Sequence, residues 1–207
     1  MQGIWLAEEQ LELRKLAESI AKEISVMATE SKWATRFVWV AIFQGALVSL
    51  LTLFLVLGEV GFLHPSVSLL INTTVPGIWI ALGYFAYLIV GVVGMAVTAL
   101  FYQYLEVNLK SPYTGGAKSL AWSHLILSNV GIIGASLLII YTGYITGVAT
   151  LPTALGGLGM VMGDVEAMVS KQFLIPIAAF AALTILGIVL GGLGYVIVYK
   201  GRPKAQF

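Results

Sequence analysis

The sequence predicts an all-α integral membrane protein: a four-helix bundle preceded by an N-terminal amphipathic helix that lies in the cytoplasm or at the membrane interface. Of its 207 residues, 59% are hydrophobic and only 10% are charged, against about 25% charged residues in soluble domains. The apolar runs are continuous over about eighteen residues or more. They are not split into the alternating segments of roughly ten residues that build a membrane β-barrel. Helices are therefore expected to carry the chain across the membrane.

The first 35 residues form the predicted amphipathic helix. Over residues 4–30, hydrophobic side chains recur at helical spacing along one side, and they are Leu6, Leu13, Leu16, Ile20, Ile24 and Met27. Acidic and basic residues nearly balance in this segment, which argues against electrostatic docking to anionic lipid. Two interpretations stay open: a helix lying on the inner membrane surface or on its own bundle, and a docking helix for a partner subunit.

Four apolar spans follow, at about 37–57, 75–101, 120–145 and 173–199, and they make up a transmembrane domain over residues 36–200. Cations flank these spans unevenly. They occur before the first span (Arg14, Lys15, Lys22, Lys32 and Arg36), between the second and third (Lys110 and Lys118) and after the fourth (Lys200, Arg202 and Lys204). The other two connections hold only Lys171. The positive-inside rule then predicts a multi-pass protein of the cell membrane with both termini, including the tail 201–207, in the cytoplasm.

Composition and motifs argue against chemistry by this chain alone. It has no cysteine and only two histidines, His64 and His124, whereas copper, zinc and non-haem iron sites usually need several His, Cys or carboxylate ligands. No catalytic triad pattern, HExxH, phosphate loop or EF-hand loop occurs. The net charge of +1 gives no indication of nucleic-acid binding. We expect no catalytic residue, no metal and no bound cofactor, with His64 in a solvated loop and His124 at the interface.

The spans carry neutral polar residues and glycine pairs in place of charge. The neutral polar residues are Gln44, Ser49, Thr52, Thr98, Ser128, Asn129, Ser136 and Thr142. Gly143 with Gly147, and Gly187 with Gly191, form GxxxG patterns, which let membrane helices approach closely. The third and fourth spans are therefore predicted to pack tightly, against partners either within the chain or in another chain. Asn72 begins a glycosylation sequon on the predicted outer loop, although such matches are common by chance.

The second span contains a dense aromatic stretch, Tyr84-Phe85-Ala86-Tyr87, in its predicted outer part. This stretch resembles the tenth helix of the catalytic subunit of haem-copper oxidases, where a His-Phe-His-Tyr sequence holds two haem irons. That helix also runs from outside to inside and ends in an aromatic cluster, matched here by Phe101, Tyr102 and Tyr104. In this sequence, Tyr84 and Ala86 stand where the family has its two histidines.

The resemblance continues into the next span. A short inner loop, residues 110–118, precedes His124 and Gly131, which keep the family's spacing between a His and a Gly at the start of its eleventh helix. The segment Gly159-Met160-Val161-Met162-Gly163-Asp164 is similar to the family's outer Gly-Met-Pro-Arg-Arg loop, without its proline or its arginine pair. The fourth span would then match the twelfth helix, and the first span, loosely, the ninth.

The departures from the family decide what the resemblance implies. The family's metal ligands are histidines, and they are missing here, so the chain is not expected to reduce oxygen. Tyr84 and His124 are left as weak candidates for cofactor binding, because haem iron accepts Tyr or His as an axial ligand. With no iron beside them, the hydroxyl groups of Tyr84 and Tyr87 should instead be bonded to protein or water.

Three functional hypotheses follow. The first is a non-catalytic, accessory subunit of a multi-subunit membrane respiratory or oxidase complex, which contacts lipid and packs against a catalytic subunit. Such a chain is not an enzyme by itself, although it belongs to an oxidoreductase complex. The second is a small oligomeric transporter or channel, with neutral polar side chains along its path. The third is an electron-transfer protein that binds a cofactor through His124 or the tyrosines. We favour the first, because the spans hold so few ionisable groups.

Overall fold

The computed structural model describes residues 12–20, 30–167 and 171–201 and is all-helical over these residues. Helix α2 (Lys32–Leu57) continues into the π-helical turn η1 (Gly58–Phe62). Helix α3 (Val67–Thr73) is followed by one continuous rod made of α4 (Ile78–Ala86), η2 (Tyr87–Val93), α5 (Gly94–Gln103) and η3 (Tyr104–Asn108). Helix α6 (Gly115–Thr150), the short elements η4 (Thr153–Leu155) and α7 (Met162–Val165), and helix α8 (Lys171–Lys200) complete the described part.

Among the described residues, four helical segments are long and apolar enough to cross a membrane: Lys32–Phe62, Ile78–Asn108, Gly115–Thr150 and Lys171–Lys200. The all-α class and the existence of four apolar helices are thus confirmed. The predicted and observed limits of the spans differ most in the second segment, where residues 75–77 form a turn and the helix continues to Asn108. Residues 102–108, which include polar side chains, continue the helix past its predicted end at Phe101.

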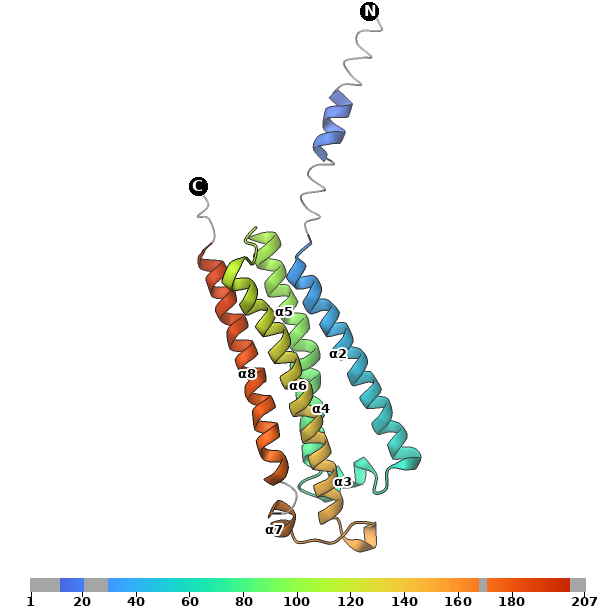
Figure 1. Ribbon diagram of the computed structural model, residues 1–207. Coiled ribbons are helices and arrows are strands. Elements are labelled where there is room, and N and C mark those ends of the chain that lie inside the picture. The colour runs from blue at the N-terminus through green and yellow to red at the C-terminus, as the bar shows by residue number, and fades with distance from the viewer. Residues whose placement is uncertain (1–11, 21–29, 168–170, 202–207) are drawn as a thin grey trace, which may run out of the picture.

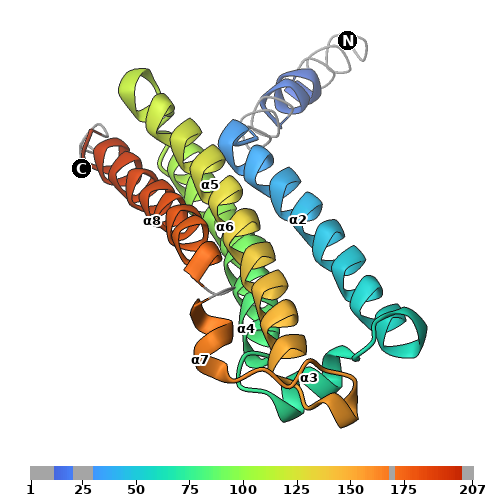
Figure 2. The ribbon, with the colours of Figure 1, turned by 60° about the horizontal axis from the view of Figure 1, so that its bottom comes forward.

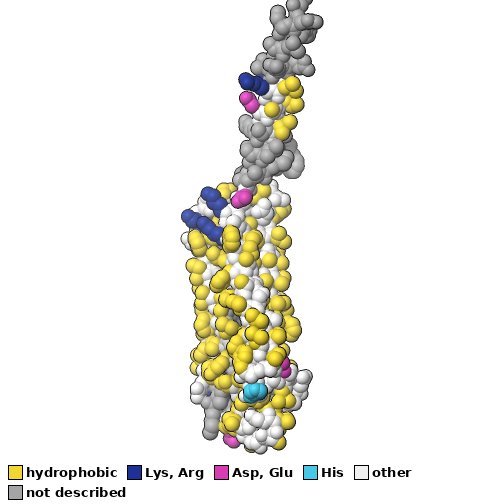
Figure 3. Space-filling view, turned by 90° about the vertical axis from the view of Figure 1, so that its right-hand side faces the viewer, with side chains coloured by type: hydrophobic (Ala, Val, Ile, Leu, Met, Phe, Trp, Pro, Cys, Tyr) yellow, Lys and Arg dark blue, Asp and Glu magenta, His cyan; other side chains and the backbone are white. Residues whose placement is uncertain are grey.

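The predicted amphipathic helix over 4–30 has residues 12–20 within the described part. These nine residues are helical and exposed. Figure 3 shows hydrophobic side chains on one side of this segment and charged ones on the other. Lys15 forms an ion pair of 2.9 Å with Glu12 on the charged side. The rest of that prediction lies outside the described residues.

The long helices form an open row. Figures 1 and 2 show α2 and α8 on opposite sides of the molecule, with the α4–α5 rod and α6 between them. α6 packs along α8 and along α4, while α2 packs on α5 and η2. In the most apolar 18-residue window of each span, 44% of the α6 residues are buried, against 17% in α2–η1 and 11% in α8. α2 and α8 are therefore the two edges of the row.

The two ends of the row differ in charge. Among the described residues, Lys32, Arg36, Lys110, Lys118 and Lys200 lie at the end where α2 begins and α8 ends, and Figure 3 shows dark blue side chains gathered there. The opposite end carries Glu59, Asp164, Glu166 and Lys171. Below, these are called the cationic end and the acidic end.

A carboxylate fixes the start of α2 at the cationic end. Ser31 is the N-cap of α2, and its Oγ accepts a hydrogen bond of 2.9 Å from the backbone N–H of Ala34. The Glu106 carboxylate accepts hydrogen bonds from the Ser31 hydroxyl at 2.5 Å and from the Trp33 backbone N–H at 3.1 Å. A carboxylate is favoured at this position because unpaired N–H groups and the helix dipole meet there. Glu106 thus ties α2 to the end of the α4–α5 rod.

Candidate functional site

The aromatic stretch of the second span is tied to α2 by hydrogen bonds. The hydroxyl groups of Tyr84 and Thr52 lie 2.8 Å apart, and the Tyr87 hydroxyl donates to Gln44 Oε1. The prediction that both tyrosine hydroxyls find partners is confirmed. Phe85, between them, is 57% exposed. The stretch therefore holds two spans together on one side and faces outward on the other.

Gln44 continues this network into α6. Its Nε2 donates to Asn129 Oδ1 at 2.7 Å, and Asn129 Nδ2 donates to the Leu125 carbonyl oxygen at 2.6 Å. Gln44 and Tyr87 are nearly inaccessible, at 1% and 2% exposure. Buried polar groups in an apolar setting normally find such partners, because an unpaired one costs several kcal/mol. These side chains bind one another across three spans.

The glycine pairs contact helices of the same chain. A Cβ added at Gly187 would come within 2.5 Å of the Ser128 backbone nitrogen, and one at Gly191 within 2.1 Å of His124 Nδ1. A Cβ at Gly143 would lie 2.8 Å from the Ile80 nitrogen, and one at Gly147 would lie 3.3 Å from Thr74 Oγ1 and 3.4 Å from Leu70 Cδ2. The Gly187 and Gly191 side of α8 therefore packs on α6, whereas the Gly143 and Gly147 side of α6 packs on the α3–α4 region.

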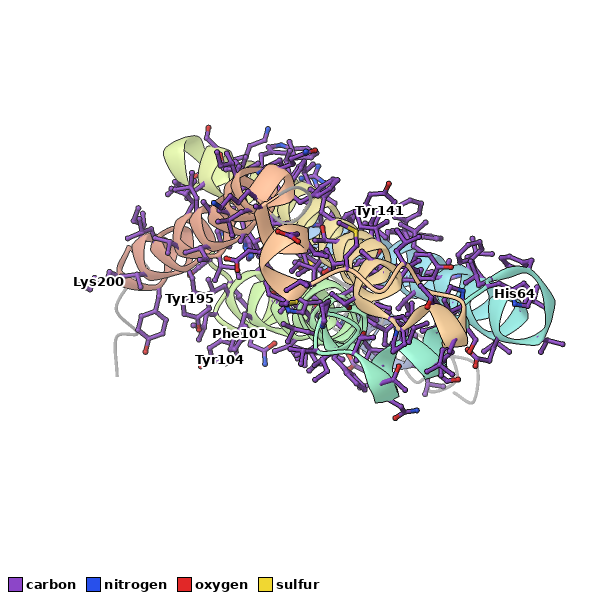
Figure 4. All side chains as sticks on the ribbon, turned by 90° about the horizontal axis from the view of Figure 1, so that it is seen from below. His64, Phe101, Tyr104, Tyr141, Tyr195 and Lys200 are labelled. Carbon is purple, nitrogen blue, oxygen red and sulfur yellow. The ribbon has the colours of Figure 1, made fainter. Side chains whose placement is uncertain are left out.

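A cavity of about 550 Å³ near the cationic end is lined by residues of three spans and by Tyr113 of the connection before α6. It lies between α5 and α8, with α6 behind it. Its exposed rim includes Phe101 of α5 and Ile188 of α8. Figure 4 shows Phe101 and Tyr195 side by side, and their rings meet edge to face at 6.0 Å. Because the rim consists of apolar side chains of two candidate spans, the cavity opens sideways on the apolar surface of the row. We call it the α5–α8 cavity.

His124 forms the back wall of the α5–α8 cavity and is 7% exposed. Its Nδ1 lies 3.3 Å from the Tyr102 hydroxyl, and its ring is 5.0 Å from that of Phe37. Tyr102 in turn stacks on Phe37 with ring centres 4.8 Å apart. Gly191 is required on α8 because any side chain there would overlap the imidazole ring. His124, expected at the interface, is thus a packed residue of the helix core.

Three hydrogen-bonding groups that line this cavity have no partner within the described part of the chain. The hydroxyl groups of Tyr113 and Thr98 form no hydrogen bond there, and His124 uses only Nδ1. Tyr113 is 6% exposed. Burial, with smaller contributions from Tyr102 and Glu106, raises its pKa well above the usual value near 10, so this hydroxyl stays protonated at physiological pH. The cavity therefore combines an apolar lining with a few unused neutral polar groups.

No family model, curated protein or solved structure matches the chain. The resemblance to haem-copper oxidases stays a hypothesis based on the quoted residues.

The two weak cofactor candidates occupy separate places. Tyr84 binds Thr52 on the α2 side, whereas His124 lies in the α5–α8 cavity. Tyr102, which contacts His124, follows Tyr84 by roughly 27 Å along the rod at about 1.5 Å per residue. The two residues are therefore not brought together around one group. No lysine or arginine lines the cavity beside His124 among the described residues, so it offers no cationic partner for haem propionates.

The remaining predicted sites lie at the acidic end. Asn72 is exposed on α3, but Thr74, the third residue of its sequon, is buried and its hydroxyl donates to the Leu70 carbonyl at 2.8 Å. His64 is exposed in the connection before α3, and Figure 4 shows it at the α2 edge. Glycosylation of Asn72 stays a prediction.

Two residues of the α5–α8 cavity were missed by sequence reasoning. The sequence assigns Tyr102 only to an aromatic cluster and places Tyr113 in a loop without any distinguishing pattern. A buried tyrosine in a connection gives no periodic signal, because its burial depends on how residues 109–114 fold back over α6. Thr98 was noted as a neutral polar residue, but nothing in its spacing placed it opposite His124.

Proposed function

We propose that this chain is a non-catalytic subunit of a multi-subunit membrane respiratory or oxidase complex and packs in the membrane against a catalytic subunit. The observation that supports this proposal is the open row of helices. A self-contained bundle shares burial among its helices, whereas here the α2 and α8 windows are only 17% and 11% buried. Each edge helix uses one side for the chain and leaves the other for lipid or for helices of another subunit.

The distribution of polar groups supports the same proposal. Gln44, Tyr87 and Asn129 bind one another, and the described ionisable side chains of the spans, apart from His124 and the tyrosines, lie at the helix ends. A subunit that serves as a scaffold needs no intramembrane charge, whereas pumps and ion-coupled transporters depend on it. The cationic end would face the cytoplasm by the positive-inside rule, with both termini there.

The described contacts give little support to the alternative of a small oligomeric transporter or channel. Of the neutral polar side chains on its expected path, Gln44 bonds to Asn129 and Thr52 to Tyr84, whereas Ser136 and Thr142 are buried without a described partner. The glycine pairs that would join copies contact helices of the same chain. The proposal of an accessory subunit therefore accounts for more of the described contacts.

Site-specific photo-crosslinking in native membranes tests the proposal. A photoreactive phenylalanine replaces Ile185 on α8 or Leu50 on α2, which are 63% and 62% exposed. The control position is Val130 on α6, which is 48% exposed but lies away from the row's edges. We expect adducts with a larger membrane protein from at least one edge position, none from Val130, and co-purification of haem or copper proteins in mild detergent.

Two outcomes would contradict the proposal. If the native chain migrates as a lone small species, without haem or copper proteins, it is not a subunit of such a complex. Adducts formed only between copies of this chain would favour the oligomeric transporter or channel, which flux into reconstituted vesicles would then test.

A further inference from the structure

The α5–α8 cavity is a built site, although it plays no part in the proposed scaffold role. Its volume of about 550 Å³ falls within the range of roughly 300–1,000 Å³ typical of small-molecule sites. The lining is largely apolar and aromatic, and its ring-bearing polar residues are Tyr102, Tyr113, His124 and Tyr195. Such sites bind through the apolar surface and orient the ligand through a few polar groups.

The unused polar groups indicate what the ligand carries. The Tyr113 hydroxyl lines the cavity and forms no hydrogen bond in the described part of the chain, although the residue as a whole is buried. Thr98 on α5 and Nε2 of His124 on α6 likewise stand without a partner there. Tyrosine and threonine hydroxyls donate to carbonyl oxygens, and a neutral imidazole can donate or accept. The ligand therefore has oxygen atoms within reach of more than one wall.

The charge of the lining and the position of the cavity's opening narrow the class of ligand further. Among the described lining residues there is no lysine, arginine, aspartate or glutamate, so a charged headgroup or carboxylate would be left without a counter-ion. The rim of Phe101, Ile188 and Val196 is apolar and exposed within the spans, so the ligand arrives from the membrane. Aromatic walls at Tyr102 and His124 favour a flat ring.

We propose that the α5–α8 cavity binds a neutral, lipid-soluble ring compound with carbonyl or phenol oxygens, that is, a quinone or quinol. The ring lies against Tyr102 and His124, and its oxygens bind Tyr113, Thr98 and His124 Nε2. The site goes beyond the proposed accessory function, and all of its lining residues belong to this chain. Binding to the isolated chain is therefore independent of whether a partner subunit exists.

Gly192 provides the sharpest variant. It lines the cavity, and a Cβ added there would meet no atom within 4 Å, so Gly192→Leu fills the cavity without displacing a neighbour. Gly61→Leu is the matched control, because Gly61 also has open space around it but lies in η1 near the acidic end. Tyr113→Phe and Thr98→Val remove one hydroxyl each at nearly constant shape and break no described hydrogen bond.

The test is a titration of the full chain in lipid nanodiscs with a decyl-substituted benzoquinone, followed by calorimetry and by quenching of tryptophan fluorescence. Decylbenzene, which has the tail but no oxygens, is titrated in parallel, and thermal unfolding of each variant checks its fold. We expect saturable quinone binding that Gly192→Leu weakens at least tenfold and Gly61→Leu leaves unchanged. Tyr113→Phe and Thr98→Val should each weaken it by about threefold to tenfold, the size of one hydrogen bond.

The opposite results overturn the proposal. If the quinone only partitions into the nanodisc lipid and its binding does not saturate, the cavity is not a quinone site. Equal binding of quinone and decylbenzene, with no effect of Tyr113→Phe and Thr98→Val, identifies the cavity as a groove for lipid acyl chains. If Gly192→Leu fails to fold, the two hydroxyl variants decide the question, because they leave the packing intact.

Discussion

Gly191 and Gly192 are neighbours on α8 whose surroundings differ sharply, and this contrast makes a direct test of the helix packing. A Cβ at Gly191 would lie 2.1, 2.4 and 2.6 Å from three atoms of the His124 ring, whereas one at Gly192 would meet nothing within 4 Å. The ring cannot withdraw easily, because Phe37 and Tyr102 pack against it. We therefore expect Gly191→Ala to destabilise the protein relative to Gly192→Ala.

The difference between the two variants follows from one physical effect. Both replace glycine by alanine in a helix, which gains about 1 kcal/mol in helix propensity in each case. This contribution cancels in the comparison and leaves the overpacking at Gly191, which costs about 1–3 kcal/mol in a filled core. The measurement is the free energy of unfolding of both variants in mixed micelles under identical conditions.

A double-mutant cycle with His124→Ala assigns the effect to the contact. Removing the imidazole ring makes room for the new methyl group, so Gly191→Ala should cost little in the His124→Ala background, with a coupling energy of about 1–3 kcal/mol. The reasoning is refuted if Gly191→Ala and Gly192→Ala agree within about 0.5 kcal/mol, or if the cost persists without the ring.

Three further predictions concern the hydrogen bonds between spans and use the same unfolding assay unless stated. Gln44→Leu removes the hydrogen bonds to the buried Tyr87 hydroxyl and to Asn129 Oδ1 and should cost about 1–3 kcal/mol. A cost no greater than that of an exposed control, Leu50→Ala, would contradict this. Tyr84→Phe removes the hydrogen bond to Thr52 and should cost about 0.6 kcal/mol. Thr52→Val removes the same bond and also the one that its hydroxyl donates to the Val48 carbonyl oxygen, so the double variant should cost no more than Thr52→Val alone; additive costs would mean that the bond is not shared. Glu106→Gln weakens the N-terminal anchoring of α2, so amide hydrogen exchange at Ser31 and the next few residues should speed up while the middle of α2 is unchanged; unchanged exchange at both places would reject that role.

The positions of the apolar spans were predictable because they depend on local properties. Within a bilayer each backbone N–H and C=O must be paired inside the segment, so a long apolar run has to form a helix whatever surrounds it. The glycine pairs were also recognisable, since close helix approach needs small residues. The paired hydroxyl groups of Tyr84 and Tyr87 were predicted on the same kind of ground, as polar groups away from water.

The candidate site was predicted far less completely. His124 was singled out as one of only two histidines, but its packing against Gly191 joins residues far apart in the chain. Tyr113 gave no signal, because a residue in a connection carries no periodicity that marks it as buried. Thr98 was noted only as a polar residue in a span. A cavity is the space left between helices, so no single segment of sequence contains it.

The sequence by itself determined that this is an all-helical chain with four spans long and apolar enough to cross a membrane, charges at their ends and few ionisable groups between them. Only the tertiary structure decided that the helices form an open row, that the glycine pairs meet helices of the same chain, and that His124 and Tyr113 share a cavity. The physical reason is that α2 and α8 are apolar on all sides, so hydropathy does not mark which face meets a neighbour. In lipid, that choice depends on the fit of shapes and on hydrogen bonds between residues distant in the sequence.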